Sequence, residues 1–310
     1  MEHWTERQIP DLVGRTAVVT GANSGLGFEV ARELSAHGAH VVMACRSQER
    51  GASAAEKVEA AGPRGSVEVA ALDLADLGSV AAFAAGFQAR HGRLDVLVNN
   101  AGIMTPPFSR TKQGFEMQFG VNHLGHFALT GQLLPTLLAT PDSRVTTVTS
   151  TGQHIGRIEL DDLNWERRKY RPLAAYGQSK LANVLFTLEL QNLLAAAGAH
   201  VRATTAHPGW SRSNLSRTQG WLMDKVLDPY LGTPTLHGAR PILRAATDPY
   251  AAGGSLWSPT YMYEHRGPVG AGRIAKRAQD ADLARRLWEV SVGLTNVDYA
   301  PLAQGKRVRA

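Results

Sequence analysis

A tyrosine and a lysine four residues apart, Tyr176 and Lys180, are the side chains of this sequence whose types and spacing could do chemistry. They stand in a stretch with helical spacing, so both would share one face of a helix. The pKa of a free tyrosine is about 10, which makes it a poor acid–base catalyst at neutral pH. A nearby cation favours the phenolate and lowers that pKa, so the pair could move a proton. The alternative is a partly buried tyrosine beside a solvated lysine.

Short apolar runs alternate along the chain with longer helical patterns, which predicts repeated β-α-β units. Strands are expected at residues 16–20, 39–45, 67–72, 94–99, 144–150, 201–206 and 254–258. Helices are expected at residues 25–37, 49–60, 77–90, 114–138, 175–197 and 280–294. The prediction is an α/β fold, a single doubly wound Rossmann-type domain over residues 1–310 with a central, mostly parallel sheet flanked by helices.

Composition narrows the function classes. The 310 residues are 44% apolar and 19% charged, which is typical of a globular chain with a sizeable core. The formal charge of +6 includes the basic end of a terminal segment, residues 300–310, that we expect to be flexible. No basic face with aromatic or helix-turn-helix context is found, so we expect no nucleic-acid partner. The first residues are polar, so no signal peptide or membrane anchor is expected. A single cysteine, Cys45, suits a reducing, cytoplasmic location.

A glycine-rich loop follows the first predicted strand directly. Gly21 allows a tight turn, Gly25 lets the backbone approach a pyrophosphate, and Gly27 permits close packing of helix on strand. The start of the next helix then faces the anion. The spacing is G-x-x-x-G-x-G, and the intervening residues Asn23, Ser24 and Leu26 join the predicted nucleotide site.

The end of the second predicted strand indicates which dinucleotide is bound. A carboxylate there would bind the ribose hydroxyls of NAD, whereas a cation would pair with the 2′-phosphate of NADP. This strand ends in Arg46, and no acidic residue occurs before Glu49. We therefore expect NADP(H), with Arg50 as a second candidate for the phosphate. The alternative for Arg46 is an exposed surface cation.

Further motifs follow the glycine loop along the chain. In order they are Asp73, Asn99-Asn100-Ala101-Gly102, Asn122, Ser150, Tyr176-x-x-x-Lys180 and Pro208-Gly209. With this set of motifs in this order, the sequence resembles the short-chain dehydrogenase/reductase family over about residues 12–300. Residues 121–127 and 179–183 are most similar to the retinol dehydrogenase-like branch of that family.

The resemblance implies a role for each motif. Tyr176 would donate a proton to a carbonyl oxygen as the nicotinamide delivers hydride to carbon, and Ser150 would hydrogen-bond that oxygen. Lys180 would hold the ribose and lower the tyrosine pKa, while Asn122 would hold a water that links Lys180 to solvent. The expected cofactor contacts are Asp73 and Leu74 at the adenine, Asn100, Ala101 and Gly102 at the adenosine side, and Pro208 and Gly209 at the nicotinamide.

Structural alternatives exist for several of these residues. Asp73 could be a helix N-cap, and Asn99 and Asn100 could be turn formers. His123 and His126 lie near Asn122, but no metal-ligand set accompanies them, so we expect packing or surface roles and no metal. Thr149 and Thr151 flank Ser150 and also carry hydroxyls; the likeness of residues 144–150 to the family's strand favours Ser150.

Mixed aromatic and aliphatic residues after the last parallel strand predict a substrate-side lid at about residues 208–238. It holds Trp210, Trp221, Arg212 and Arg217, and an acidic substrate held by Arg212 is an alternative to an apolar one. Because no membrane anchor is expected, a retinoid embedded in a lipid membrane is not expected as the substrate.

The expected function is NADPH-dependent reduction of an apolar ketone or aldehyde. The alternatives are NADP-dependent oxidation of a secondary alcohol and a non-catalytic nucleotide sensor. The family suggests a homodimer or homotetramer paired through the helices expected at residues 114–138 and 175–197, although the C-terminal extension could block one such interface.

Overall fold

The computed structural model describes residues 3–210 and 234–303, and eight strands of this part form one sheet. Their order across the sheet is β3-β2-β1-β4-β5-β6-β7-β8. Neighbours from β3 to β7 run parallel, and β8 pairs antiparallel with β7. The predicted α/β fold with a mostly parallel sheet is confirmed. The strands are β1 (Thr16–Thr20), β2 (His40–Cys45), β3 (Ser66–Ala71), β4 (Val96–Asn99), β5 (Arg144–Val148), β6 (Arg202–Ala206), β7 (Leu256–Tyr261) and β8 (Arg266–Ala271).

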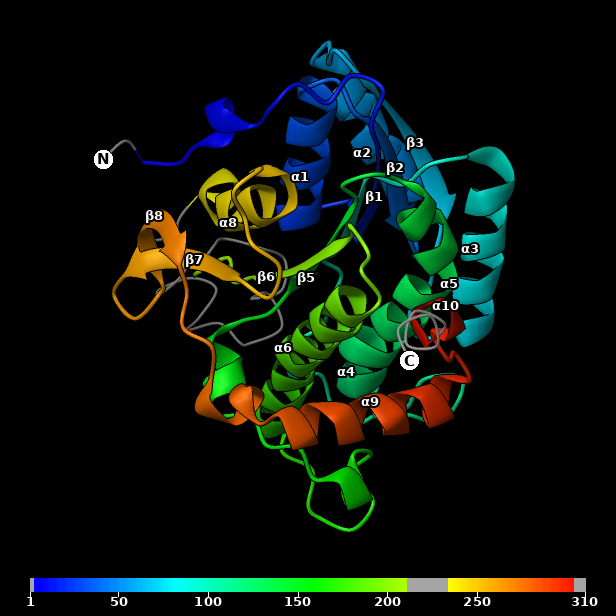
Figure 1. The fold of residues 1–310 in the computed structure, drawn as a ribbon, viewed down its shortest axis with the longest axis vertical. Helices are drawn as coiled ribbons and strands as arrows, with labels where there is room; N and C mark the ends of the chain where they lie inside the picture. The colour runs from blue at the N-terminus through cyan, green and yellow to red at the C-terminus, as the bar shows by residue number, and fades with distance from the viewer. Residues whose placement is uncertain (1–2, 211–233, 304–310) are drawn as a thin grey trace.

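Helices cover both faces of the sheet (Figure 1). One face carries α1 (Gly25–Ala36), α2 (Gln48–Ala60) and α8 (Thr235–Thr247), whose apolar sides pack with the sheet into one core. The opposite face carries α3 (Leu77–Arg90), α5 (Gly125–Ala139) and α6 (Pro172–Ala196), which form a second core. Strand β1 is buried along its whole length, as expected for a central parallel strand.

The strand order reverses between β1 and β4, which are neighbours in the sheet but far apart in the chain. In open α/β sheets, ligands bind beyond the carboxyl ends of the strands at such a reversal. The glycine loop follows β1 and the Asn-Asn-Ala-Gly motif follows β4. The topology therefore brings both predicted nucleotide-binding segments to one place.

The stretch predicted as one helix over residues 114–138 is interrupted by a π-helical turn. It consists of α4 (Met117–Phe119), the π-helical turn Gly120–Leu124, and α5. Glu116 caps its start, because its carboxylate oxygens accept hydrogen bonds from the amides of Gln118 (2.9 Å) and Phe119 (2.7 Å). Single π-helical turns are common at functional sites, and this one contains Asn122.

The C-terminal part adds a last strand to the sheet and two helices. Strand β8 was not predicted and extends the sheet by a hairpin. Helix α9 (Ala281–Thr295) was predicted within one residue, and it packs its buried side, including Leu287, against α6. The short helix α10 (Ala300–Ala303) follows. The remaining short elements are the 3₁₀ turns Glu6–Gln8, Thr151–His154, Leu160–Asp162 and Lys276–Gln279.

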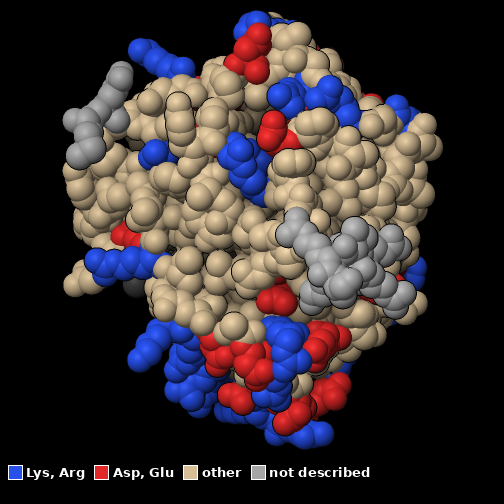
Figure 2. Space-filling view, in the orientation of Figure 1, with Lys and Arg blue, Asp and Glu red and all other residues tan. Residues whose placement is uncertain are grey.

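Charged side chains of both signs intermingle at the lower end of the molecule, over α9 and the loop before α6 (Figure 2). Arg285 pairs there with Asp282 (2.6 Å) and Glu289 (2.7 Å). Such exposed pairs each contribute little to stability. Among the residues that the structure describes, no helix is both long and apolar enough to cross a membrane.

Candidate functional site

The predicted hydroxyl, phenol and ammonium groups meet beyond the carboxyl end of β5. Ser150 follows β5, and its Oγ accepts a hydrogen bond from Gly152 N (2.9 Å). Tyr176 lies in the first turns of α6 and is 6% exposed, and the Ser150 hydroxyl lies close enough to its phenol to affect the pKa of that phenol. A Cβ on Gly152 would lie 2.9 Å from Ser150 Oγ and 3.2 Å from the tyrosine ring, so both side chains line the same small space.

Lys180 lies one turn further along α6, where its Nζ is 5.7 Å from the centre of the Tyr176 ring. The ammonium donates a hydrogen bond to the carbonyl of Val148 (3.2 Å) at the end of β5. A Cβ on Gly102 would lie 3.6 Å from Lys180 Nζ and 3.3 Å from Asn122 Oδ1. The lysine is therefore buried next to Gly102 and Asn122, and the alternative of a solvated lysine is wrong.

Burial is the main cause of the pKa shifts of Tyr176 and Lys180. It raises the pKa of Tyr176 above its ordinary value, although the Ser150 hydroxyl opposes that shift. It also lowers the pKa of Lys180 to about 8. The two causes of the Tyr176 shift are burial and the Ser150 hydroxyl, so the lowering of the tyrosine pKa expected from Lys180 stays a prediction.

Asn122 uses its side chain to brace the loop after β4. Its Oδ1 accepts from Ile103 N (2.9 Å), and its Nδ2 donates to Ile103 O (3.0 Å) and to Ser179 Oγ (2.9 Å). The π-helical turn thus joins the β4 loop to α6 beside Lys180. The water-holding role expected of Asn122 stays a prediction.

The glycine loop has the geometry that its residues require. Gly21 and Gly25 adopt positive φ angles of 66° and 57°, which favour glycine. A Cβ on Gly27 would lie 2.5 Å from Gly21 O and 2.6 Å from Asn100 Nδ2, so only glycine fits there. Asn100 itself donates through Nδ2 to Thr20 O (2.8 Å), which fixes the β4 loop against the glycine loop.

A histidine that the sequence assigned to packing or the surface supports both loops. His126 is buried, and its Nδ1 is 3.0 Å from Asn122 O while its Nε2 is 2.9 Å from Thr20 Oγ1. Thr20 Oγ1 accepts from the amides of Asn100 and Ala101 at 2.9 Å each. Burial lowers the pKa of His126 to about 4, so the ring is neutral and its Nε2 can accept a hydrogen bond from the Thr20 hydroxyl. His123 packs on Phe119 and lies 2.9 Å from Ser291 Oγ.

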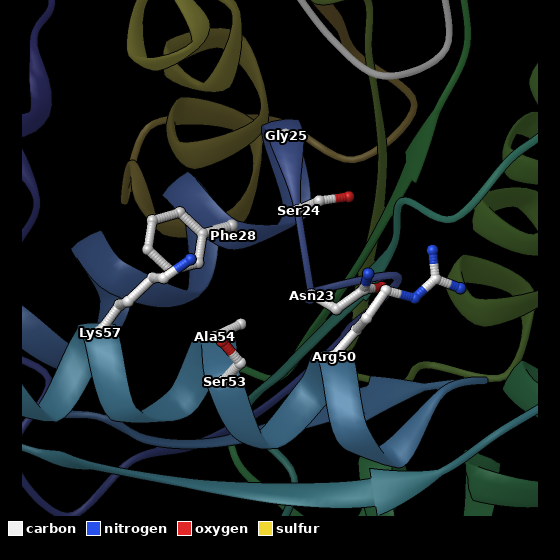
Figure 3. Close-up of a pocket in the computed structure, with 8 residues that line it drawn as sticks. All are labelled: Asn23, Ser24, Gly25, Phe28, Arg50, Ser53, Ala54 and Lys57. Carbon is white, nitrogen blue, oxygen red and sulfur yellow. The ribbon is translucent and has the colours of Figure 1, made fainter.

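A groove of about 350 Å³ opens between the glycine loop and α2 (Figure 3). One wall is Asn23, Ser24, Gly25 and Phe28, and the other is formed by α2. The residues contributed by α2 are Arg50, Ser53, Ala54 and Lys57. The sequence indicated Arg50 but missed Lys57, which lies two helical turns later on the same face. Arg46 is exposed at the end of β2 and is not among the residues that line this groove.

The loop after β3 holds Asp73 and Leu74 in defined positions. Asp73 Oδ1 accepts from Ala75 N (2.9 Å), and Asp73 N donates to Ser79 Oγ (2.9 Å). The N-cap of α3 is Asp76, which accepts from Gly78 N, so the N-cap alternative for Asp73 is wrong. Leu74 is buried against Gly125 at the start of α5.

The Pro208-Gly209 turn is held by the β7–β8 hairpin. Gly209 has a φ of 71°, and a Cβ there would lie 2.7 Å from His265 O. Trp210 N donates to the same carbonyl (3.1 Å). Trp221, Arg212, Arg217 and most of the predicted lid at 208–238 lie outside the described residues.

Sequence reasoning also missed His207, which stands directly before Pro208. The side chain is buried, and neither ring nitrogen makes a hydrogen bond of ordinary geometry to a described residue. Burial lowers the pKa of His207 to about 3, and the nearby His265 adds to that shift. In the sequence, its position between the end of a predicted strand and Pro208-Gly209 could have indicated His207 as a candidate site residue.

Comparison with known proteins agrees with this geometry. The profile of the family described as short chain dehydrogenase matches residues 15–220. The chain belongs to the short-chain dehydrogenases. Its relatives in this family include human retinol dehydrogenase 12, which is 41% identical over 95% of this chain and 90% of its own length. Human retinol dehydrogenase 13 is 40% identical over 92% of this chain and 86% of its own. This short-chain dehydrogenase thus lies in the retinol dehydrogenase-like branch and is an NAD(P)-dependent oxidoreductase.

Solved structures share the fold of this short-chain dehydrogenase. An uncharacterized protein from Mycobacterium paratuberculosis superimposes with a TM-score of 0.82 at 45% identity, over 96% of this chain and 99% of its own. A Beutenbergia cavernae protein, described as an NAD(P)-dependent gluconate 5-dehydrogenase with bound NADP, gives a TM-score of 0.64 at 27% identity. That match covers 79% of this chain and 95% of the other.

Proposed function

We propose that this short-chain dehydrogenase reduces an apolar ketone or aldehyde with NADPH, using Tyr176 as the proton donor and no metal. The observation that carries the proposal is the meeting of Ser150, Tyr176 and Lys180 in one buried space. That space lies beyond the carboxyl ends of the central strands, beside the glycine loop. A hydroxyl, a phenol and an ammonium together can hold a carbonyl oxygen and protonate it.

The residues around the glycine loop fit a dinucleotide. Gly21 and Gly27 let the glycine loop pack closely against the loop after β4, and Asn23, Ser24 and Gly25, at the start of α1, line the groove. The other residues proposed to contact the cofactor are Asn23, Ser24, Leu26, Asp73, Leu74, Asn100, Ala101, Gly102, Pro208 and Gly209. The bound cofactor would supply the hydride.

The choice of NADP(H) over NAD(H) rests on charge. Arg50 and Lys57 line the groove, and Arg46 is exposed at the end of β2. A 2′-phosphate would neutralise this local positive charge, whereas NAD offers only hydroxyls there. The solved relative that contains NADP supports the same choice.

The proton would pass along side chains of this protein. Ser150 would donate a hydrogen bond to the substrate oxygen, and Tyr176 would give it a proton as the carbonyl carbon accepts the hydride. Lys180, whose Nζ lies 5.7 Å from the centre of the Tyr176 ring, would hold the ribose of the cofactor and stabilise the phenolate that Tyr176 leaves. Because the described contacts of the Asn122 side chain go to Ile103 and Ser179, we assign Asn122 a positioning role in which any water would add to those contacts.

An apolar substrate is favoured by the branch to which the chain belongs. The relatives are named for retinol, so the corresponding aldehyde, retinal, belongs in the first panel beside aliphatic and aromatic ketones. NADPH oxidation with each carbonyl measures turnover.

Tyr176→Phe tests the proposal, because it removes one hydroxyl and keeps the ring. We expect kcat to fall by about 10³-fold while NADPH still binds. Tyr250→Phe, at a position 92% exposed, is the matched control and should leave kcat unchanged. Turnover of Tyr176→Phe close to that of the wild type would overturn the mechanism.

A further inference from the structure

Two histidines and a glutamate meet at the end of the sheet opposite the nucleotide site. His40 is the first residue of β2, Glu68 lies in β3, and His91 directly follows α3. Three elements that are separate in the chain therefore each contribute one side chain. One ligand atom of each, an imidazole nitrogen or a carboxylate oxygen, lies within 4.8 Å of the others.

The carboxylate of Glu68 already bridges the two rings. Its Oε1 is 2.9 Å from His91 Nε2, and its Oε2 is 3.9 Å from His40 Nε2. In a tetrahedral zinc site with bonds of about 2.0–2.1 Å, ligand atoms are separated by roughly 3.3 Å. Side-chain movements of about 1 Å or less would therefore suffice to place one ion among the three groups.

A neighbouring serine orients one of the rings. His40 Nδ1 is 2.8 Å from Ser66 Oγ, on the paired position of β3. When Nδ1 donates its proton to that oxygen, Nε2 presents its lone pair toward Glu68 and His91. Metal-binding histidines commonly have such an outer partner, which fixes the tautomer and the ring orientation.

The surroundings keep the rings in place but leave a path from solvent. The His91 ring packs on Phe87 (4.7 Å between ring centres) and on His40 (5.3 Å). The side chains of His40 and Glu68 are about one third exposed. Arg90 Nη2 lies 3.5 Å from Glu68 Oε1 and is the competing cation; its side chain is 54% exposed and can turn into water.

We propose that His40, Glu68 and His91 form a binding site for Zn²⁺. Two imidazole nitrogens and one carboxylate oxygen suit this ion, with water in the fourth position. The ion would tie the edge strand β3 to β2 and to the end of α3, on the side of the fold away from Tyr176. Its effect would therefore be on stability and not on the chemistry of the reductase site.

The test is titration of the full-length protein, first freed of metal with a chelator, with Zn²⁺ alone against a competing chromogenic chelator. We expect one equivalent to bind, and thermal unfolding to shift to higher temperature with Zn²⁺. His91→Ala and Glu68→Gln should each weaken binding by at least about 100-fold, and Ser66→Ala by about 10-fold, because it removes only the orienting partner.

His200→Ala is the matched control, since this exposed histidine lies outside the cluster and should leave Zn²⁺ affinity unchanged. Circular dichroism of each metal-free variant checks that it folds; Glu68→Gln, which nearly keeps the side-chain shape, still reads out the site if His91→Ala does not fold. Equal Zn²⁺ affinity in the wild type, Glu68→Gln and Ser66→Ala, or no binding to the wild type, would overturn the proposal.

Discussion

At the residue scale, the buried ammonium of Lys180 links activity to stability. Burial lowers its pKa from 10.5 to about 8 in the folded protein. Between these values the unfolded chain holds the proton and the folded chain has released it. The free energy of unfolding should therefore rise with pH across that window, by at most about 3 kcal/mol.

We predict that Lys180→Met removes this pH-dependent gain and lowers kcat/KM by at least about 100-fold. Methionine fills similar space without a charge to desolvate. Urea unfolding at pH 7 and pH 9.5, with kcat/KM measured at pH 7, checks both effects. Lys112→Met, at an exposed lysine paired with Asp76, is the control. An unchanged pH dependence of unfolding in Lys180→Met would contradict the assignment.

The sequence was sufficient to predict the candidate site residues that carry recognisable types, such as Ser150, Tyr176 and Lys180. It could not predict the support given by His126, because that role depends on Thr20, more than a hundred residues away. The burial that raises the pKa of Tyr176 could not be predicted either. Spacing shows that a cation is near, but the cost of burial depends on everything packed around the phenol.

At the scale of elements, α2 presents its cations to the groove at helical spacing. Arg50 and Lys57 lie on the same side of α2 as Ser53 and Ala54 (Figure 3). We predict that Arg50→Ala and Lys57→Ala each weaken NADPH binding by about 10-fold, equivalent to about 1.4 kcal/mol, and leave NADH binding unchanged.

Fluorescence titration with both nucleotides measures the difference. Arg64→Ala is the control, because Arg64 follows α2 but pairs with Asp11 (3.2 Å). A parallel loss of NADH affinity would show that these side chains do not act through the 2′-phosphate.

Most strands and helices were predicted within one to three residues, because apolar runs and glycines mark their ends. Helix α8, the π-helical turn and β8 were not predicted. A π-helical turn keeps the same apolar pattern as an α-helix, and the edge strand β8 (Arg266–Ala271) contains glycines and a proline that read as a loop. Such elements depend on tertiary contacts, here the pairing of β8 with β7.

At the scale of the whole molecule, residues 281–303 pack over α5 and α6, the helices expected to pair between subunits. Tyr299 donates a hydrogen bond to Phe127 O (2.7 Å), and its ring contacts that of Trp288 (4.5 Å between centres). A partner subunit that paired through α5 and α6 would have to displace these residues. We therefore expect the wild type to sediment as a 33.4 kDa monomer.

A glycine in α5 lets us test this arrangement. A Cβ on Gly131 would meet Val297 and would lie 2.7 Å from the Tyr299 ring, so Gly131→Ala should displace the segment and lower stability by about 1–2 kcal/mol. Gly86→Ala, in α3 with only Arg90 at 3.8 Å, should instead stabilise slightly. Sedimentation and thermal unfolding of both variants check this, and a wild-type dimer joined through α5 and α6 would contradict it.

The reactivity of the single cysteine can report on motion at the edge of the sheet that carries the glycine loop. Cys45 ends β2, is 1% exposed, and has its pKa raised to about 11 by burial. A thiol reagent can reach it only when β2 and the glycine loop separate for a moment, so the labelling rate measures how often that happens. A nucleotide bound at the glycine loop would slow the labelling of Cys45. The ratio of the labelling rates without and with the nucleotide would give the free energy by which the nucleotide stabilises the closed form.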